Sequence, residues 1–437
     1  MDSCYDVEGL AVAALDTAGR AVAGLVRRLS GAQPEATVDP LLAQAWFAGS
    51  FTPRGWEIPP PWDAIAGDYP CRDGWIRLHT NAPHHRAAAL AVLGFAVGSV
   101  PDKPEVAAVV ARWDGTGLEN AVLAAGGCAA QLRTPQEWAA HPQGRAVAAE
   151  PLIAWTDHGA TAATASAAGP ERPLAGVRVL DLTRVIAGPA ATRFLAGFGA
   201  EVLRIDPPGW EEPALIPEMT VGKRCARLDL KSDAGAQRIR ELIADADILV
   251  CGYRPGALSG LGLDEPELRR LRPGLVRVEL DAYGWTGPWA GRRGFDSLVQ
   301  MSSGIADAGM RYFGADRPVP LPVQALDHAT GYFAAAAAVA AWSDRLQGRV
   351  RSARLSLART AAELRPEPGT AEQKTGAPDT GGHALPTVPE HTKWGPGTRL
   401  LPPLTFSGPE AAQPRMFWTV PAAPLGSAPP SWPGRQS

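Results

Sequence analysis

The feature that most constrains the fold is a regular alternation of strand-like and helix-like segments in the middle of the chain. The run LAGVRVLDLTR predicts a buried strand, IAGPAATRFLAGFG predicts a turn into a helix, and AEVLRIDPP predicts a second strand. The alternation continues with the strand RCARLDL, a helix at 233–244, the strand ILV, the helix LDEPELRRLR and the strand LVRVELD. Such alternation predicts a mainly parallel sheet covered by helices, a Rossmann-like α/β fold.

Segments of a different character flank this core. We expect helices between residues 5 and 46, a strand in DGWIRLHT and a helix in HHRAAALAVLG. Two more amphipathic helices are expected between 103 and 127, and Thr134 with Glu137 matches a capping box. The predicted division is a helical/α+β domain at 1–159, a small, polar linker at 160–172, the Rossmann-like domain at 173–360 and a Pro/Gly-rich extension at 361–437, part of it disordered or an extended strap.

The charge and the apolar segments exclude some classes of partner. The 437 residues carry a formal net charge of −3, with a pI of about 6.3, so no overall basic field attracts nucleic acid or an anionic membrane. The N-terminus carries acids where a signal peptide carries bases, and the apolar run from Tyr332 to Trp342 is too short to span a bilayer. We expect no nucleic-acid partner and no membrane partner.

The cysteines and histidines do not predict a metal site. Five cysteines are scattered along the chain without a Cys-x-x-Cys pair, which is typical of reduced thiols in the cytoplasm. His84, His85 and His141 lack acidic or cysteine companions at ligand spacing, so we interpret them as surface or capping residues. The predicted location is cytoplasmic, and the predicted metal content is none.

Asp327 is the candidate reactive residue. It follows a proline-rich loop and lies at the start of a strongly apolar, alanine-rich helix. One interpretation is an N-cap, in which the carboxylate accepts a hydrogen bond from the first turn. The other is a nucleophile or general base that backbone donors and the helix dipole keep ionised. The local sequence alone favours the cap.

Basic residues follow several of the predicted strands. Arg184 lies in the first turn, DLTRVIAGPAA, which is not GxGxxG but places amides at a helix N-terminus that suits a phosphate or carboxylate. A tight turn around Gly188 and Pro189 is an equal alternative. The other bases have two interpretations, a binding site for a nucleotide-like anion or a solvated basic face, and these residues alone favour the solvated face. They are Lys223, Arg224, Arg227, Lys231 and Arg254, the last beside Tyr253.

Six blocks in order give the chain a family resemblance. LAGVRVLDLTRVIAGPAATRFLAGFGAEVLRIDPPG, GKRCARLDLKS, ADILVCGYRPGALSGLGL, LVRVELDAYGWTGPW, FDSLVQMSSGIA and VQALDHATGYFAAAAAVAAW resemble the class III CoA-transferase family (CaiB/BaiF) over about residues 173–360. The resemblance implies that Asp327, with Gly331 after it, attacks an acyl-CoA thioester to form an acyl-aspartyl anhydride. The CoA thiolate then returns to give an aspartyl-CoA thioester, and an acceptor carboxylate collects the CoA.

The same resemblance implies the ligands and the residues that bind them. It implies acyl-CoA and a small carboxylic acid as substrates, no permanently bound cofactor, and a homodimer whose chains interlock. It also implies that backbone N–H groups near the nucleophile stabilise the oxyanions. The residues implied to bind CoA are Arg184, Val185, Ile186, Ala187, Leu228, Lys231, Tyr253 and Tyr283. Gly252 and Gly260 depart from the family, which commonly has Asn and Arg there.

Further departures keep two other functions open. An α-methylacyl-CoA racemase carries a His-Asp pair where this chain has Phe295 and Asp296, so transfer is favoured over racemisation. The signatures DGWIRL and RTPQEWAAHP, which belong to the family's small domain, here precede the Rossmann-like half. Gly381 and Gly382 are too little to match the family's glycine-rich lid. A catalytically degenerate CoA-binding homologue or partner subunit is therefore the other alternative.

Overall fold

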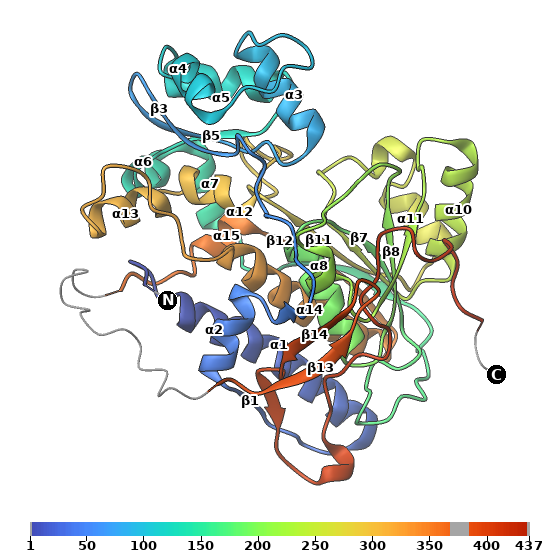
Figure 1. Ribbon diagram of the computed structural model, residues 1–437. Coiled ribbons are helices and arrows are strands. Elements are labelled where there is room, and N and C mark those ends of the chain that lie inside the picture. Colours follow the sequence, from blue (N-terminus) through green and yellow to red (C-terminus); the bar gives the residue numbers. More distant parts are fainter. Residues whose placement is uncertain (1, 368–383, 435–437) are drawn as a thin grey trace.

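A seven-stranded sheet forms the centre of the computed structural model, which describes residues 2–367 and 384–434 (Figure 1). The strand order is β6-β12-β11-β10-β7-β8-β9, and every neighbouring pair is parallel except β6 with β12. This confirms the predicted α/β fold class. The strands are β6 (Ala154–Ala160), β7 (Arg178–Leu182), β8 (Glu201–Asp206), β9 (Lys223–Arg227), β10 (Ile248–Cys251), β11 (Val276–Asp281) and β12 (Arg349–Ser356).

Helices cover both faces of this sheet, so its inner strands are apolar on both sides. Val179 of β7 points into one core, with α8 (Ala187–Gly197) and α14 (Ala325–Arg345). Leu180, the next residue, points into the opposite core, with α10 (Asp233–Ala244) and α11 (Glu265–Leu271). The sequence predicted α8, α10 and α11 and the strands between them, and these predictions are confirmed.

The alanine-rich α14 lies in the middle of the larger core. It packs against α8 on one side and against α1 (Val7–Ser30) on another. Within the described residues α1 is the one helix long and apolar enough to cross a membrane, but its Leu15, Val22 and Leu25 are buried in the same core as α14. Core helices share such a composition. The N-terminal segment is thus part of the main body.

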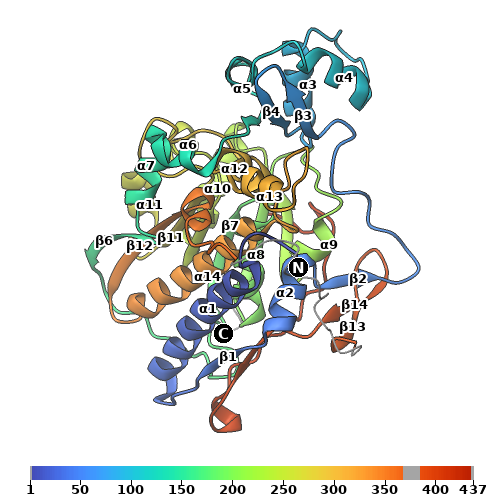
Figure 2. The same cartoon turned by 90° about the vertical axis from the view of Figure 1, so that its left-hand side faces the viewer.

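A small α+β unit sits at one end of the molecule (Figure 2). Its antiparallel sheet has the order β3-β4-β5, with β3 at Gly67–Cys71, β4 at Gly74–Leu78 and β5 at Ala129–Gln131. Ile76, Leu78 and Leu118 belong to a separate core between this sheet and its helices. We call β3–β5 with these helices the small unit. The helices are α3 (Pro83–Val92), α4 (Lys103–Val110) and α5 (Gly115–Ala124).

Short helices connect the small unit to the main body. The predicted capping box is confirmed at α6, where the Thr134 amide donates to Glu137 and the Glu137 amide donates to Thr134 Oγ1. His141 caps α7, as expected, because its Nδ1 accepts from the amide of Gln143 at 3.0 Å. The remaining α-helices are α2 (Pro40–Ala48), α6 (Pro135–Ala140), α7 (Pro142–Ala149), α9 (Ile216–Met219), α12 (Asp296–Ser302), α13 (Ile305–Tyr312) and α15 (Leu357–Ala361), with 3₁₀ turns at Ser259–Leu261 and Glu410–Ala412.

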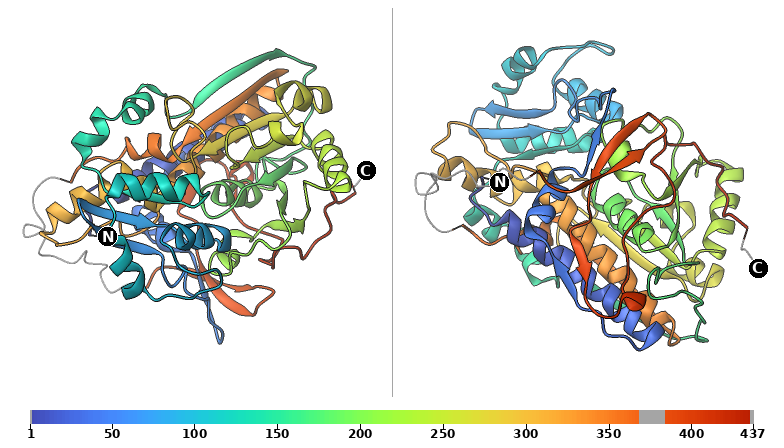
Figure 3. Two further views of the ribbon diagram at one scale, coloured as in Figure 1. Left: turned by 90° about the horizontal axis from the view of Figure 1, so that it is seen from above. Right: turned by 60° about the horizontal axis from the view of Figure 1, so that its bottom comes forward.

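The described part of the C-terminal extension docks on its own chain. Its strands pair with strands near the N-terminus, β14 with β2 and β15 with β1 (Figure 3). Trp418 donates its Nε1–H to the carbonyl of Arg193 in α8 at 2.9 Å. Gly381 and Gly382 lie outside the described residues. The strands are β1 (Ala36–Val38), β2 (Phe51–Pro53), β13 (Thr387–His391), β14 (Pro396–Leu400) and β15 (Leu404–Phe406).

The sequence analysis did not predict two strands of the main sheet, β6 and β12. The strand β6, AWTDHGA, is largely exposed along its length and pairs only with β12, at the edge of the sheet. An exposed edge strand has no apolar alternation from which it could be predicted. Because β6 belongs to the predicted N-terminal segment, that segment contributes a strand to the Rossmann-like sheet. The four-segment division stays a prediction.

Candidate active site

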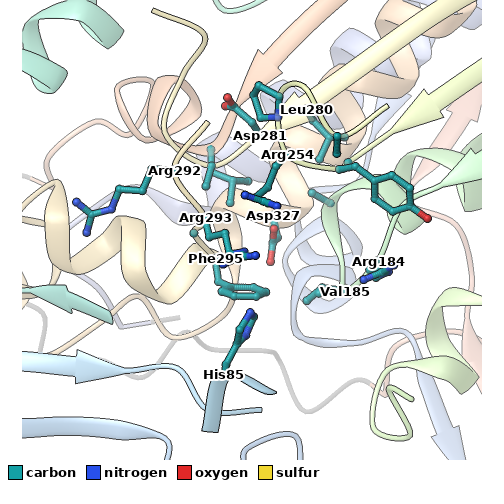
Figure 4. Close-up of a pocket in the computed structure, with 18 of the residues that line it drawn as sticks. His85, Arg184, Val185, Arg254, Leu280, Asp281, Arg292, Arg293, Phe295 and Asp327 are labelled. Carbon is teal, nitrogen blue, oxygen red and sulfur yellow. The ribbon is translucent and has the colours of Figure 1, made fainter. Parts of the chain in front are cut away.

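One cavity, with a volume of about 570 Å³, collects the candidate site residues. It opens where β7, β10 and β11 end, the edge at which parallel α/β sheets bind ligands. The small unit supplies its far wall, so both halves of a single chain contribute (Figure 4). The lining includes His84, His85, Arg184, Val185, Ala187, Trp210, Lys231, Gly252, Tyr253, Arg254, Gly260, Asp281, Arg292, Arg293, Gly294, Phe295 and Asp327.

Asp327 reaches this cavity as a carboxylate without a partner. It is the third residue of α14, and the N-cap position belongs to Gln324, so the N-cap interpretation is wrong. The residue is 6% exposed, and its carboxylate makes no hydrogen bond or ion pair with the described part of the chain. Carboxylates buried to this extent are normally paired. Asp327 is therefore available to react with a ligand rather than to hold the helix.

Asp296 performs the capping that the sequence suggested for Asp327. Its Oδ2 accepts the amide N–H of Asp327 at 2.9 Å, and its carboxylate also accepts the amide of Leu326. Gln300 donates to Oδ1 at 2.5 Å and accepts the amide of Leu321 with its own Oε1 at 2.7 Å. The cap of α14 thus comes from the first residue of α12. This network holds the nucleophile candidate by its backbone and leaves its side chain free.

The two carboxyl groups influence each other's protonation. Burial raises the pKa of Asp327 well above its usual range, and the adjacent Asp296 raises it further. Burial also raises the pKa of Asp296, to about 6, although the hydrogen bonds from Gln300 and the two amides oppose the rise. The expectation that the helix N-terminus keeps Asp327 ionised is wrong for the free protein. No donor reaches its carboxylate in the described residues, so burial dominates.

The turn between β7 and α8 supplies backbone groups to the cavity. Val185 is the one residue other than glycine with a positive φ, 66°, in the described chain, an unusual conformation for a β-branched side chain. Its amide donates to Glu212 at 2.8 Å. The amides of Ile186 and Ala187, at the start of α8, donate to no described acceptor. A helix N-terminus with free amides attracts negative charge.

Asp181 holds the same turn in place through hydrogen bonds. It accepts the amide and hydroxyl of Thr183 and the hydroxyl of Thr192, and Lys223 lies 3.1 Å away. Lys223 is fully buried, and burial lowers its pKa to about 8 against the opposing effect of Asp181. The basic residues that the sequence grouped together therefore have different surroundings. Lys223 is structural, Arg227 pairs with Glu211, and Lys231 reaches the cavity.

Four cations line the cavity without a carboxylate partner among the described residues; they are Arg184, Lys231, Arg254 and Arg293. The guanidinium of Arg184 lies 4.5 Å from the ring centroid of Trp210 and 5.1 Å from that of Tyr253. Burial raises the pKa of Tyr253 to about 12, so its hydroxyl stays a hydrogen-bond donor. The arrangement suits a ligand with several negative charges and a flat group that can stack.

The structure brings together only part of the predicted CoA-binding set. Arg184, Val185, Ala187, Lys231 and Tyr253 line the cavity together with Asp327. Ile186 is buried beside Met219, and Leu228 packs against the core on the α10 side. Tyr283 is fully buried, and its hydroxyl lies 3.0 Å from Ser302 Oγ. The side chains of these three residues are not part of the cavity lining, so only their backbone could contribute.

Sequence reasoning missed the contribution of His84 and His85. Both belong to the first turn of α3 in the small unit and line the cavity, while His85 is also buried. Burial, with a smaller contribution from nearby His84 and Arg293, lowers the pKa of His85 to about 4. Phe295 separates His85 from Asp327 in Figure 4. Only contacts between distant segments make these residues part of the site, so no local signal could have identified them.

The sequence predicts that the protein holds no metal ion, and the structure does not test this prediction. Among the described residues no three histidine, cysteine, aspartate or glutamate side chains come together as metal ligands.

The positions of Gly252 and Gly260 have space for a side chain. A Cβ at Gly252 would come no closer than 3.4 Å to a neighbouring atom, and a Cβ at Gly260 would meet nothing within 4 Å. The cavity is thus wider at the two positions that depart from the family pattern.

Comparisons with known proteins agree with the core of the prediction. The acetyl-coenzyme A transferase nodX of Hypoxylon pulicicidum is 37% identical over 189 residues, 42% of this chain and 31% of that protein. Succinyl-CoA:glutarate CoA-transferase of Mus musculus is 36% identical over 184 residues, 39% of this chain and 41% of that protein. A crystal structure of Rv3272 from Mycobacterium tuberculosis has a TM-score of 0.40 and 33% identity, over 44% of this chain and 55% of that chain.

The matched region is the Rossmann-like half. The chain spans about a third to a half of the length of the curated relatives it matches. The sequence profile described as CoA-transferase family III matches residues 174–392, which is half of the chain and contains Asp327, Asp296 and the turn after β7. This protein therefore belongs to CoA-transferase family III.

Proposed function

We propose that this protein transfers CoA from an acyl-CoA to a carboxylic acid, with Asp327 as the nucleophile. The observation that carries the proposal is the buried Asp327 carboxylate in a cavity with four cations, Arg184, Lys231, Arg254 and Arg293. None of these five groups has an ion-pair partner within residues 2–367 and 384–434. CoA carries a diphosphate and a third phosphate, which need such cations, whereas the whole chain has a net charge of −3. The relatives' names support the reaction class, because they include an acetyl-coenzyme A transferase and a succinyl-CoA:glutarate CoA-transferase.

The proposed reaction consists of four acyl-substitution steps, in which the Asp327 carboxylate is the covalent carrier. An Asp327 oxygen attacks the thioester carbon, the C–S bond breaks, and the CoA thiolate leaves an acyl-aspartyl anhydride. The thiolate then attacks the Asp327 carbonyl carbon and releases the donor acid, which leaves an aspartyl-CoA thioester. The acceptor carboxylate attacks that thioester and expels the thiolate again. Attack of the thiolate on the acceptor carbonyl finally yields acceptor-CoA and free Asp327.

Two local features assist these steps in the proposal. The thiolate and the tetrahedral oxyanions need donors, and the amides of Ile186 and Ala187 at the start of α8 are free to donate. The first-turn amides of α14 cannot do so, because Val323 and Asp296 already accept from Ala325, Leu326 and Asp327. Arg184, Lys231 and Tyr253 bind the nucleotide end of CoA. CoA acts as a substrate, and we propose no permanently bound cofactor.

A trapping experiment tests the proposal. The purified protein is incubated with a panel of acyl-CoAs, treated with hydroxylamine, digested and analysed by mass spectrometry. We expect a hydroxamate on the peptide that contains Asp327 and CoA exchange into added acids. Asp327→Asn, which keeps the shape but cannot attack, should remove both signals. Asp316→Asn changes an aspartate on a loop outside the cavity and serves as the matched control.

The same experiment separates the two alternative functions. A racemase would incorporate solvent deuterium at the α-carbon of a 2-methylacyl-CoA without exchange of CoA, but Phe295 stands where the second acid/base group is required. A catalytically degenerate homologue would bind CoA without forming an adduct. The widened lining at Gly252 and Gly260 is the observation that favours this second alternative.

Assembly and location are further parts of the proposal. We propose a cytoplasmic homodimer, and the reduced state of all five cysteines, none of which forms a disulfide, is consistent with that compartment. Light scattering of the purified protein coupled to size exclusion measures the mass directly. A mass near the 45.9 kDa of one chain would contradict the dimer. Fractionation of the source cells would test the location.

A further inference from the structure

The turn between β7 and α8 contains a residue in a strained backbone conformation. Val185 has a φ of 66°, in the left-handed region, where the Cβ of a residue other than glycine crowds the following carbonyl group. This crowding disfavours the conformation by a factor of about 5 to 30. Such strain persists only where neighbouring groups enforce it, and it occurs most often at active sites. The groups that hold Val185 are therefore candidates for a role in function.

Glu212 holds the backbone of Val185. Its Oε1 accepts the amide N–H of Val185 at 2.8 Å, and its Oε2 accepts from Nη2 of Arg204 at 2.8 Å. Arg204 also donates twice to Asp206, at 2.9 Å each. All three side chains of this network are buried. The network gives the Glu212 carboxylate a fixed position, and the Val185 amide is bound to it.

The other end of the turn is fixed independently of Glu212. Asp181 accepts the amide N–H of Thr183 at 3.0 Å. A Cβ at Gly188 would lie 2.2 Å from the Thr183 side chain, so the start of α8 packs directly on this residue. The segment 184–187 therefore lies between two fixed ends, and Glu212 contacts its middle.

The conformation of Val185 decides which groups of the turn face the cavity. Arg184, Val185 and Ala187 line the cavity together with Asp327 (Figure 4). The Arg184 guanidinium has no carboxylate partner among the described residues, and the Ala187 amide donates to no described acceptor. A change of Val185 to a negative φ would rotate the adjoining peptide groups and turn these donors away from each other. Glu212 does not line the cavity, so it acts on a ligand only through the turn.

We infer that Glu212 is a positioning residue of the candidate active site, which holds the turn after β7 in the shape that receives CoA. The inference rests on the proposed function and adds to it a residue that touches neither CoA nor Asp327. The hydrogen bond from Val185 to Glu212 offsets the strain of the left-handed conformation. Arg204 neutralises the buried charge of this carboxylate, and a charged acceptor binds an amide more strongly than a neutral one does. Loss of Glu212 should therefore weaken CoA binding, although all four cations of the cavity remain.

Calorimetry of CoA binding to the purified protein tests the inference. Glu212→Ala should raise the dissociation constant of CoA by about fivefold to thirtyfold, the factor by which a residue other than glycine disfavours the left-handed conformation. Glu211→Ala is the matched control, since it removes the same charge one residue earlier. Glu211 is 61% exposed and pairs with Arg227 rather than with the turn, so the dissociation constant should stay within about twofold.

A second substitution distinguishes positioning of Val185 from a general loss of stability. Val185→Gly removes the strain, because glycine adopts a positive φ without steric cost. In the Val185→Gly background, Glu212→Ala should raise the dissociation constant by about threefold or less. A purely structural role of Glu212 beside Arg204 would give the same loss in both backgrounds. Urea unfolding followed by circular dichroism checks that each compared variant is folded.

A shorter acid provides the same comparison with the buried ion pair retained. Glu212→Asp keeps a negative charge beside Arg204, so it should fold even if Glu212→Ala does not. The Asp side chain is shorter by one methylene group and cannot reach both Arg204 and the Val185 amide. Glu212→Asp should therefore weaken CoA binding, and Val185→Gly should reduce this loss as well.

The outcomes separate this inference from the proposed function. CoA binding that is unchanged in the Glu212 variants, or a loss that Val185→Gly does not reduce, would overturn the positioning role. A hydroxamate on Asp327 would then still support CoA transfer. If the wild-type protein did not bind CoA, the inference and the proposed function would fail together.

Discussion

At the scale of single residues, the site depends on two carboxyl groups with different roles. Asp296 accepts two backbone amides and the Gln300 side chain, whereas Asp327 accepts nothing within the described residues. A carboxylate that is fully satisfied stabilises the fold, and one that is buried without donors destabilises it. The proposed role as a nucleophile explains the cost of Asp327, since active sites commonly keep groups that reduce stability. The same chemical substitution should therefore have opposite effects at the two positions.

The first prediction compares Asp327→Asn with Asp296→Asn at pH 7.5. Asp327→Asn should raise the free energy of unfolding by about 1–2 kcal/mol, because it removes a buried carboxyl group that charging would destabilise. Asp296→Asn should lower the free energy of unfolding by about 1–3 kcal/mol, because the NH₂ group of Asn would face N–H groups that donate to the Asp296 carboxylate in the wild-type protein. Urea titrations measure both values. If Asp327→Asn destabilised the protein, the carboxylate would have a stabilising partner that the structure does not contain.

The gain from Asp327→Asn should depend on pH with a definite sign. The folded-state pKa of Asp327 is raised, so the stability of the wild-type protein is fully present below the ordinary aspartate pKa and falls as pH rises through the folded value. The stability difference between Asp327→Asn and wild type should therefore grow with pH above the ordinary aspartate pKa. Paired unfolding curves across this range check the trend. A constant difference would contradict the raised pKa.

The second prediction concerns the rate at which Asp327 reacts. Only the ionised carboxylate attacks a thioester, and burial together with Asp296 raises the Asp327 pKa well above its usual range. The rate of acyl-Asp327 formation should rise with pH in a range where an ordinary aspartate is already ionised. Asp296→Asn removes the repelling charge, so its half-maximal pH should be lower. Single-turnover trapping at several pH values measures both, and a pH-independent wild-type rate would contradict the raised pKa.

At the scale of elements, the contact between α14 and α8 places Asp327, the proposed nucleophile, beside the turn that contains the free amides. Gly331 makes this contact possible, since a Cβ there would lie 2.5 Å from the carbonyl oxygen of Ala187 and 3.0 Å from Ala190. Glycine costs helix stability, so its presence in the middle of α14 indicates a packing requirement. The family's D-x-x-x-G spacing thus has a physical meaning. The aspartate and the glycine that lets α8 approach lie on neighbouring turns of one helix.

The third prediction uses this contact, with a second helical glycine as its control. Gly331→Ala should lower the free energy of unfolding by about 1–3 kcal/mol and slow adduct formation, because α8 must move away. Gly24→Ala in α1, where a Cβ would meet nothing within 4 Å, should raise it by about 0.5–1 kcal/mol. Thermal or urea unfolding measures both. Equal effects at the two positions would show that helix propensity rather than packing decides them.

At the scale of the whole molecule, distant segments of one chain close around the core. The segment 384–434 pairs with strands near the N-terminus, and the small unit lies over the cavity at the sheet edge. A buried ionic network joins these parts. Arg399 of β14 contacts Ser50 at 2.8 Å and Glu218 at 3.1 Å, and Glu218 also pairs with Arg193 of α8. Burial by itself would raise the pKa of Glu218, but the charges of Arg193 and Arg399 outweigh it and lower this pKa to about 2.

The fourth prediction tests this network. Arg399→Met should lower the free energy of unfolding by about 3–5 kcal/mol, because it leaves buried acids with fewer partners. Arg415→Met is the matched control, since Arg415 and its partner Glu171 are 72% and 55% exposed, and its effect should stay within about 0.5 kcal/mol. Urea unfolding followed by tryptophan fluorescence compares the two variants. A small effect at Arg399 would mean that the C-terminal segment docks through its apolar contacts alone.

The sequence by itself determined the elements that local patterns encode. Apolar strands alternating with helices specified the parallel sheet, and the ordered blocks around Asp327 indicated the family. They also named Asp327 as the candidate reactive residue. Only the tertiary structure decided what surrounds that residue. The cap from Asp296 and the place of the small unit's histidines in the cavity both arise from contacts between segments far apart in the chain. Burial and partner choice are properties of the packed molecule, so a side chain's charge and availability follow from its neighbours in space rather than in sequence.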